Sequence, residues 1–379
     1  MCIVVIVDKL KNNTYFCKPK YKCMNKFNEI FSDRLKRARI MRNLSMDALC
    51  EKIGNAVSKQ AISKYEKGES LPGSHILILL SQALGVKPDY FFRESQFAIS
   101  NIEFRKKAKM GVKEVESIKE EIRDILERYL EIEAIWEYSP SFVNPIKGIP
   151  VTSDKDVYEV AKRLKNVWKV GEDGILSVTD LLESKNIKVV EITADPSFDG
   201  LSGYINNDEN VPFVVVNKSF DVERLRFTAL HELAHLVMSL PEEMDKKQKE
   251  RLCHLFANEM LISREVFIDV MGEKRYDISL RELKVLQAFY GISVDALMFK
   301  AKTLRVISES KFTSFCISKN QSSQLKKAVE LSVYKGIEES RRFERLVYRA
   351  LASDMISYSK AAVLLNESIE EVKGRLELV

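Results

Sequence analysis

The chain has 379 residues, of which 45% are hydrophobic and 30% are charged. This composition is typical of a folded protein with two or three domains, and it excludes collagen, low-complexity disorder and a disulfide scaffold. The net charge of +5 is uneven, because residues 1–93 carry 17 basic and 8 acidic side chains and the remainder carries 43 and 47. A basic N-terminal part favours a polyanionic partner there, although a basic surface without a partner fits the charge equally well.

Residues 1–26 are expected to form a tail. Either this tail is disordered, or translation starts at Met24 and residues 1–23 are not translated. The apolar run at residues 2–7 is shorter than the roughly 20 residues of a membrane-spanning helix and lacks the flanks of a signal peptide. The six cysteines are widely spaced, which is typical of free thiols in a cytoplasmic protein. We therefore expect a cytoplasmic location and no membrane partner.

Residues 27–93 predict a small all-α domain. Ser45 and Ser58 are suitable helix N-caps, and glycines follow the helices where a left-handed C-cap is common. The second and third helices, joined by a turn at 55–57, have the layout of a helix-turn-helix, which places its second helix in the major groove of double-stranded DNA. The expected elements cover residues 28–41, 45–54, 58–68, 77–85 and 88–92.

The third of these helices begins with long polar side chains that can reach base edges, since Gln pairs well with adenine and Lys with guanine. The candidate DNA contacts are Lys59, Gln60, Ser63 and Lys64. An ordinary pair of helices with solvated polar residues would show a similar pattern.

Four stretches of this region, residues 34–39, 44–45, 57–68 and 84–86, resemble the phage-repressor or Xre family of DNA-binding domains. The resemblance implies that the helix after Ser58 lies in the major groove with the contacts named above. It also makes Arg37 and Lys67 candidate phosphate contacts.

Residues 94–150 are interpreted as a helical linker. Aliphatic residues recur at three-to-four spacing between Val112 and Ile132, which predicts a long amphipathic helix. Its apolar face could pack on the following domain or on a second copy of the chain, which would make the protein a homodimer. Three prolines between residues 140 and 150 break the pattern afterwards.

Residues 151–300 alternate between extended and helical patterns, and residues 301–379 are expected to form a helical C-terminal region. The predicted fold class is therefore α+β, mostly helical, with one small sheet. Strands are expected over 187–192, 201–205 and 213–216, with a polar turn at 206–210. Helices are expected over 156–168, 177–184, 221–239, 246–261 and 280–290.

The most specific local signal is His231-Glu232-Leu233-Ala234-His235, in the middle of a predicted helix. Residues four apart share a helix face, so the two histidines can bind one Zn²⁺ while Glu232 takes a proton from water. The helix follows the strand at 213–216, whose exposed edge could pair with an extended peptide. The alternative is a pair of histidines that merely pack on a helix.

A catalytic zinc usually has three protein ligands and one open position. Glu250 and His254 are four residues apart on the next predicted helix and share a face, so that either could be the third ligand. Glu259 lies about half a turn out of phase with Glu250 and fits less well.

The wider region resembles the ImmA/IrrE family of metallopeptidases. The matching residues are 200–204, 214–217, 226–228, the His231 motif and 250–261. The resemblance implies a zincin-like peptidase domain over residues 151–300, with Glu250 as the third zinc ligand.

The chain departs from that family pattern at three positions, Cys253 (usually Ala), His254 (usually Asn or Asp) and Ser263 (usually Pro). In the family, the acid or amide at position 254 would support a ligand histidine from behind. An imidazole there would either do the same or bind the metal itself.

The two resemblances together imply a DNA-binding transcription regulator with a zinc-dependent endopeptidase domain, which cleaves an Xre-type repressor in a stress or mobile-element response. One alternative is a transcription factor whose peptidase-like domain is a catalytically silent sensor or dimerisation module. Another is the toxin component of a toxin–antitoxin pair.

Overall fold

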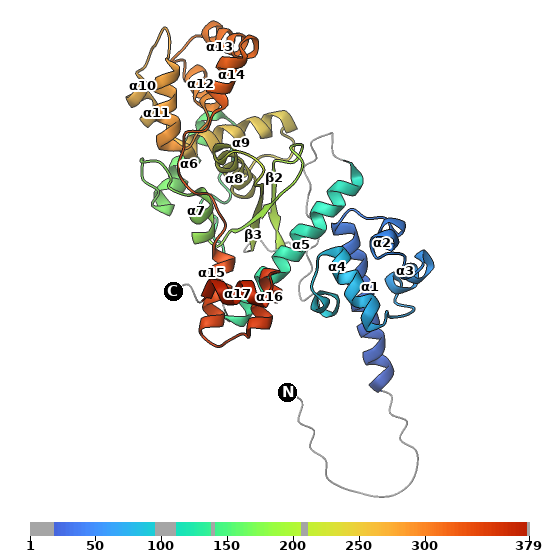
Figure 1. Cartoon of the computed structure of the whole chain (residues 1–379). Coiled ribbons are helices and arrows are strands. Elements are labelled where there is room, and N and C mark those ends of the chain that lie inside the picture. Colours follow the sequence, from blue (N-terminus) through green and yellow to red (C-terminus); the bar gives the residue numbers. More distant parts are fainter. Residues whose placement is uncertain (1–18, 95–110, 138–140, 206–210, 377–379) are drawn as a thin grey trace, which may run out of the picture. The chain divides into compact units, whose positions relative to one another are not determined.

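The computed structural model describes residues 19–94, 111–137, 141–205 and 211–376 (Figure 1). Residues 1–18, which make up most of the predicted tail, and the predicted turn at 206–210 lie outside the described residues. The contacts divide the chain into two units, unit 1 (Met1–Glu94) and unit 2 (Ser95–Val379).

Unit 1 is all-helical, as predicted. Its first helix begins at Pro19, well before the expected start at residue 28. Both predicted serine caps are present, because Ser45 Oγ accepts from the Ala48 N–H and Ser58 Oγ accepts from the Ala61 N–H. The elements are α1 (Pro19–Met41), α2 (Met46–Lys52), α3 (Lys59–Glu66), α4 (Ser74–Leu84) and the 3-10 helix η1 (Pro88–Phe92).

The core of unit 1 joins all five elements. Its side chains with no exposed surface include Phe31, Leu35, Leu49, Ile62, Leu84 and Phe91. Helix α4 ends at Gly85, whose φ of +61° is a left-handed conformation that favours glycine. An ion pair between Arg39 and Glu66, with Nε–Oε1 at 2.6 Å, further ties α1 to α3. The core and this ion pair hold α3 with its N-terminal residues at the surface.

Unit 2 contains one three-stranded sheet of β1 (Lys188–Ile192), β2 (Gly200–Tyr204) and β3 (Pro212–Asn217), in the order β1-β3-β2. Strand β1 is parallel to β3, and β2 is antiparallel to it. The expectation that the strand at 213–216 has an exposed edge was therefore wrong, because β3 is the central strand and both of its edges are paired. Strand β2 lies next to α8 (Val222–Val237), the helix that carries His231 and His235. One edge of β2 pairs with β3, and no described strand pairs with its other edge.

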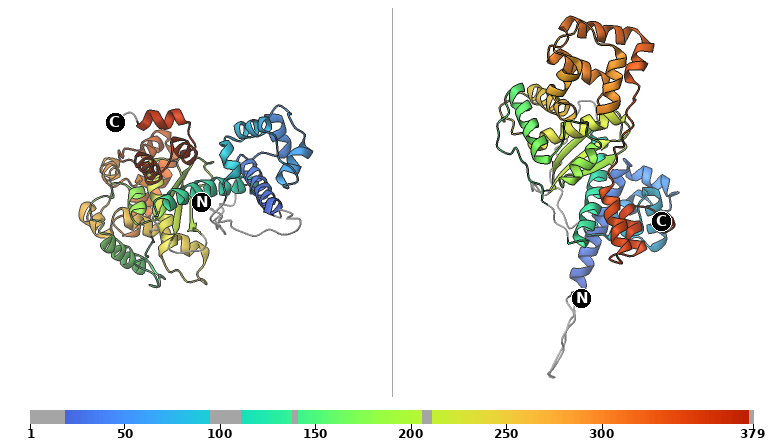
Figure 2. Two further views of the ribbon diagram at one scale, coloured as in Figure 1. Left: turned by 90° about the horizontal axis from the view of Figure 1, so that it is seen from below. Right: turned by 90° about the vertical axis from the view of Figure 1, so that its left-hand side faces the viewer.

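Alternate side chains of β3 face opposite helices, as the period of two in a strand requires. Val214 and Val216 pack with residues of α8 (Val222–Val237), and Phe213 and Val215 pack with α5 (Val112–Ile135). Figures 1 and 2 show these two helices on opposite faces of the sheet. The helix interpreted as a linker is thus a structural layer of unit 2.

The predicted helices of residues 154–290 are present in unit 2. Helices α10 and α12 have no counterpart in the sequence-based prediction. The helices are α6 (Asp154–Trp168), α7 (Val178–Ser184), α9 (Lys246–Leu261), α10 (Arg264–Met271), α11 (Leu280–Tyr290), α12 (Val294–Thr303), α13 (Glu309–Gln321), α14 (Ser323–Glu330), α15 (Arg342–Ala352), α16 (Tyr358–Leu365) and α17 (Ile369–Leu376).

The predicted helical C-terminal region is interrupted at residues 331–341, which form no helix and which we call the strap. Glu338 of the strap accepts hydrogen bonds from the N–H groups of Val178 and Thr179 at the start of α7. It also pairs with Arg226 of α8, whose side chain is completely buried. The strap therefore ties the C-terminal part of the chain to the helix that carries His231.

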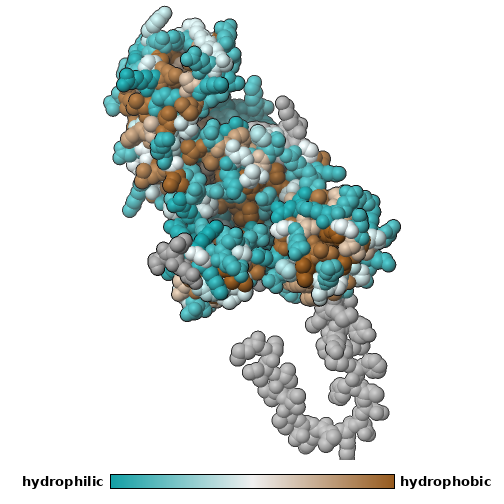
Figure 3. Space-filling model, viewed as in Figure 1, coloured by the Kyte–Doolittle hydropathy of each residue, from teal (hydrophilic) through white to brown (hydrophobic). Residues whose placement is uncertain are grey.

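The surface in Figure 3 is mostly hydrophilic, and apolar side chains show in several places, among them the helices of residues 264–321. The exposed apolar side chains there are Val270, Tyr276, Val285, Phe289, Phe299 and Ile317. Among the described residues, no helix is both long enough and apolar enough to span a membrane.

Candidate metal centre and DNA-binding surface

Helix α8 brings the two histidines of the motif together, as the spacing of four predicts. His231 Nε2 and His235 Nε2 are 3.1 Å apart, and the two rings are nearly perpendicular at 86°. Both side chains are largely buried, with 12% of His231 and 3% of His235 exposed. The two nitrogens therefore face one common point between the rings.

Helix α9 places Glu250 at that point. Glu250 Oε2 lies 3.2 Å from His231 Nε2 and 3.7 Å from His235 Nε2. The hydrogen bonds from His231 and His235 hold the pKa of this carboxyl well below its usual range. Among the described residues, His231, His235 and Glu250 are the group whose ligand atoms lie close enough to hold one metal ion.

The spacing of these three atoms fits a tetrahedral zinc site. Zn–N and Zn–O bonds of about 2.0–2.1 Å at tetrahedral angles place ligand atoms roughly 3.3 Å apart. The measured separations of 3.1, 3.2 and 3.7 Å bracket that value. Two imidazole lone pairs and a carboxylate repel each other at such distances unless a proton or a cation lies between them. Two imidazoles with a carboxylate are also a donor set that Zn²⁺ uses.

Glu232, the expected proton acceptor, is 6% exposed and is held by the sheet. The Ser202 hydroxyl of β2 donates to Glu232 Oε2 at 2.8 Å. Gly200 permits this close approach of β2 to α8, because a Cβ there would lie 2.7 Å from Thr228 Cγ2 and 2.6 Å from the Val215 carbonyl oxygen. Sequence reasoning assigned no role to Ser202. Neighbouring residues of a strand point to opposite faces of the sheet, and Leu201 is buried. This alternation along β2 is the one feature of the sequence that could have placed Ser202 on the face toward α8.

His254 lies outside the group of three. The centroid of its ring is 4.5 Å from that of His231, at an angle of 36°, and the residue is exposed. His231 Nδ1 is buried and has no hydrogen-bond partner among the described residues. Glu259, which fitted the spacing less well, is turned away and accepts from Lys300 Nζ at 2.8 Å.

Cys253 contacts His235 on the side of the ring that faces away from Glu250. Its Sγ lies 3.2 Å from His235 Nδ1, the ring nitrogen that faces away from Glu250. The departure from the family pattern at 253 therefore brings a thiol into contact with a candidate ligand. Sequence spacing could not reveal this contact, because it joins two different helices.

In unit 1, four of the candidate DNA contacts lie at the exposed surface of α3 or just after it: Lys59, Gln60, Lys64 and Lys67. Ser63 is half-buried. Lys59 Nζ is 2.7 Å from Asp47 Oδ2, and both of these side chains are more than half exposed. These side chains have the location that contact with a groove requires.

Arg37 does not share this exposure, although it was expected to contact phosphate. It is 6% exposed, and its Nη1 lies 3.6 Å from Asp33 Oδ2. A guanidinium with so little exposed surface is poorly placed to meet a phosphate, so its position favours a role in packing α1.

Comparison with known proteins supports the division into two functional parts. Residues 35–91 match the helix-turn-helix family, and residues 182–302 match the family of the IrrE N-terminal-like domain. Two similar proteins are both named uncharacterized HTH-type transcriptional regulators, y4aM and y4wC of Sinorhizobium fredii. The first is 43% identical over 61 residues, and the second is 40% identical over 62 residues.

These two matches cover a small part of the chain. Each covers 16% of this chain and 41% or 42% of the relative. The chain thus spans about two-fifths of the length of the curated relatives that it matches. In terms of families, the chain carries an Xre-type helix-turn-helix domain at residues 35–91 and an IrrE/ImmA-like peptidase-family domain at residues 182–302.

Proposed function

We propose that the protein is a DNA-binding transcription regulator with a zinc-dependent endopeptidase centre, acting in the cytoplasm on a repressor of the Xre type. The observation that carries the proposal is the meeting of His231, His235 and Glu250 at one point, with Glu232 on the same helix as the two histidines. The match to a peptidase family supports the same reading.

His231, His235 and Glu250 would hold the zinc ion, which when bound would act as a Lewis acid toward a peptide carbonyl and lower the pKa of water. The carboxylate of Glu232 would accept the proton of the attacking water and return it to the leaving amine. Ser202 orients that carboxylate by donating to Oε2.

The substrate would bind in extended form along β2. This strand pairs with β3 on one side, and no described strand pairs with its other side. An added peptide strand would gain main-chain hydrogen bonds there. Strand β2 runs beside α8, because Ser202 of β2 donates a hydrogen bond to Glu232 of α8. A peptide on the outer edge of β2 would therefore lie near the three candidate zinc ligands.

Unit 1 would bind double-stranded DNA with α3 in the major groove, using Lys59, Gln60, Ser63, Lys64 and Lys67. The proposal rests on the exposure of Lys59, Gln60, Lys64 and Lys67, and on the helix-turn-helix match. The basic character of residues 1–93 would add attraction to phosphate that does not depend on sequence.

The test uses the full chain and Xre-type repressors of the same cell, beginning with any that is encoded beside its gene. We expect the zinc-loaded protein to cut the repressor, and Glu232→Gln to cut it about 10²–10⁴-fold more slowly. The variant should still bind one zinc, because Glu232 is not among the three proposed ligands. Glu243→Gln, which changes an exposed acid outside the site, is the matched control.

Zinc content is measured by atomic absorption and cleavage by mass spectrometry of the fragments. One zinc per chain with no cleavage by the wild type would overturn the peptidase part of the proposal and favour a sensor or dimerisation role for the domain. Equal cleavage by the wild type and Glu232→Gln would remove Glu232 from the mechanism.

A further inference from the structure

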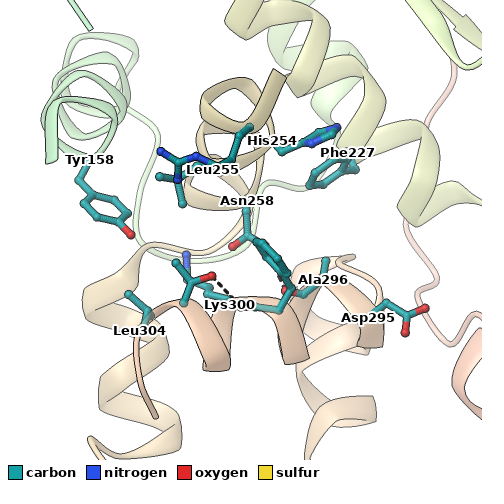
Figure 4. A pocket seen from close by; sticks show the side chains of 12 residues that line it. Tyr158, Phe227, His254, Leu255, Asn258, Asp295, Ala296, Lys300 and Leu304 are labelled. Atoms are coloured by element: carbon teal, nitrogen blue, oxygen red, sulfur yellow. Dashed lines mark hydrogen bonds between the residues drawn. The ribbon is translucent and has the colours of Figure 1, made fainter. Parts of the chain in front are cut away.

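A pocket of about 330 Å³ opens beside the candidate metal centre in unit 2 (Figure 4). It is formed by α6, α8, α9 and α12, and its surface is almost entirely apolar. Phe227 and His254 lie next to each other on the side of α8 and α9, and Ala296 and Lys300 of α12 face them across the pocket. The volume is at the lower end of the roughly 300–1,000 Å³ that is common for ligand pockets.

The pocket lies beside the metal centre, because two of its lining residues are close neighbours of the candidate ligands. Phe227 precedes His231 by four residues on α8, and His254 follows Glu250 by four on α9, so each lies one turn along the same helix face. The His254 ring lies 4.5 Å from His231 and 5.8 Å from Phe227. A peptide held at the metal centre would therefore present the next side chain to this pocket.

The charged residues of the lining do not call for a charged occupant, because each has a partner outside the pocket. Arg251 pairs with Asp154 at 2.6 Å, Asp295 with Lys319 at 2.6 Å, and Lys300 with Glu259 at 2.8 Å. Most of the remaining lining consists of apolar and aromatic side chains, namely Leu255, Ala296, Phe299, Leu304, Tyr158 and Phe227. Such a surface gains most from burying an apolar group.

We propose that this pocket binds a large aliphatic or aromatic side chain of the peptide substrate, at a residue flanking the bond that is cut. The proposal rests on the proposed function, and it adds a sequence preference to it. Cleavage sites would carry a residue such as leucine or phenylalanine on one side of the scissile bond.

The test measures binding, so that it is independent of turnover. Zinc-loaded Glu232→Gln full chain is titrated in a calorimeter with two series of hydroxamates that place a side chain on opposite sides of the metal-binding group. One series is the N-acetyl glycine, leucine and phenylalanine hydroxamates. The other is succinyl hydroxamates that carry hydrogen, isobutyl or benzyl on the carbon next to the distal carbonyl.

In one series we expect the isobutyl or benzyl member to bind at least tenfold more tightly than the unsubstituted member, the ratio that burial of such a side chain provides. Ala296→Phe, added to Glu232→Gln, fills the pocket and should reduce this preference below threefold. The affinity for the unsubstituted hydroxamate should stay within twofold of its value without Ala296→Phe. Thr303 also lines the pocket, about two turns after Ala296 on α12. Thr303→Phe should therefore reduce the preference in the same way. Val285→Phe on the exposed face of α11 is the matched control and should keep the preference.

Absence of a preference in both series, or a preference that survives both filling variants, would overturn the proposal while the metal centre stands. Failure of the unsubstituted hydroxamates to bind zinc-treated protein would instead count against the metal centre, and the pocket proposal would fall with it. Equal binding of the apolar members after zinc is removed would show a small-molecule site independent of the peptide, which also overturns the proposal.

Discussion

Cys253 Sγ and His235 Nδ1 are 3.2 Å apart, in a place where both side chains are almost fully buried. The opposite nitrogen of His235 faces Glu250 and His231. If that nitrogen binds a metal, Nδ1 carries the proton and donates it to the sulfur, which is a weak acceptor. Cys253 would then fix the orientation of a ligand, the task that a carboxylate or carbonyl usually performs.

Cys253→Ala is expected to weaken zinc binding about tenfold, at the lower end of the range for loss of a group that supports a ligand. Competition with a fluorescent chelator at neutral pH measures the change. Cys316→Ala, on α13 and away from the centre, is the control and should leave the affinity unchanged. Unaltered zinc affinity in Cys253→Ala would show that the thiol only fills space.

Glu338→Ala is expected to destabilise unit 2 by about 3–5 kcal/mol, because it leaves the buried guanidinium of Arg226 without its carboxylate. It also removes the acceptor for two N–H groups of α7. Urea unfolding followed by circular dichroism measures the loss, with Glu339→Ala, an exposed acid of the strap, as control. A loss no larger than that of the control would mean that the strap does not support α8.

Lys64→Ala is expected to weaken binding to all DNA sequences and to lower the slope of log K against log salt by about 1, if the exposed ammonium contacts phosphate. Gln60→Ala should cost about 1–3 kcal/mol on the preferred sequence and little on others, if the amide reads a base. Fluorescence anisotropy with oligonucleotides selected from a random pool measures both. Lys26→Ala on α1 is the control, and identical behaviour of the three variants would contradict the proposed contacts.

Glu183 predicts a pH dependence of stability. Burial raises its pKa from 4.5 to about 7, against the opposing hydrogen bonds from Ser340 and Arg342. Because the folded state holds the proton more tightly than the unfolded state, the contribution is fully present below pH 4.5 and is lost as the pH rises to about 7.

Relative to Glu183→Gln, the wild type should therefore lose roughly 3 kcal/mol of unfolding free energy between those pH values and change little above them. Urea unfolding at a series of pH values gives the difference. Glu243→Gln, an exposed acid that does not act on Glu183, serves as control. Parallel curves for the wild type and Glu183→Gln would contradict the raised pKa.

Much of the candidate site was predictable because it depends on local geometry. The spacing of His231 and His235 places both rings on one face of any α-helix, and Ser45 and Ser58 cap helices by reaching only three residues along the chain. The half-turn offset of Glu259 likewise indicated that it would point elsewhere, as it does. Glu250 and His254 share a face, so helix periodicity alone could not choose between them.

The sequence by itself therefore determined most of the helices, the capping serines and the motif that places His231, Glu232 and His235 close together on one helix. Only the tertiary structure decided that Glu250 meets these imidazoles, that β2 is the edge strand and that Ser202 reaches Glu232. It also decided that α12 closes an apolar pocket beside the centre. These features join segments far apart in the chain, and their positions follow from which apolar faces pack together rather than from any local repeat.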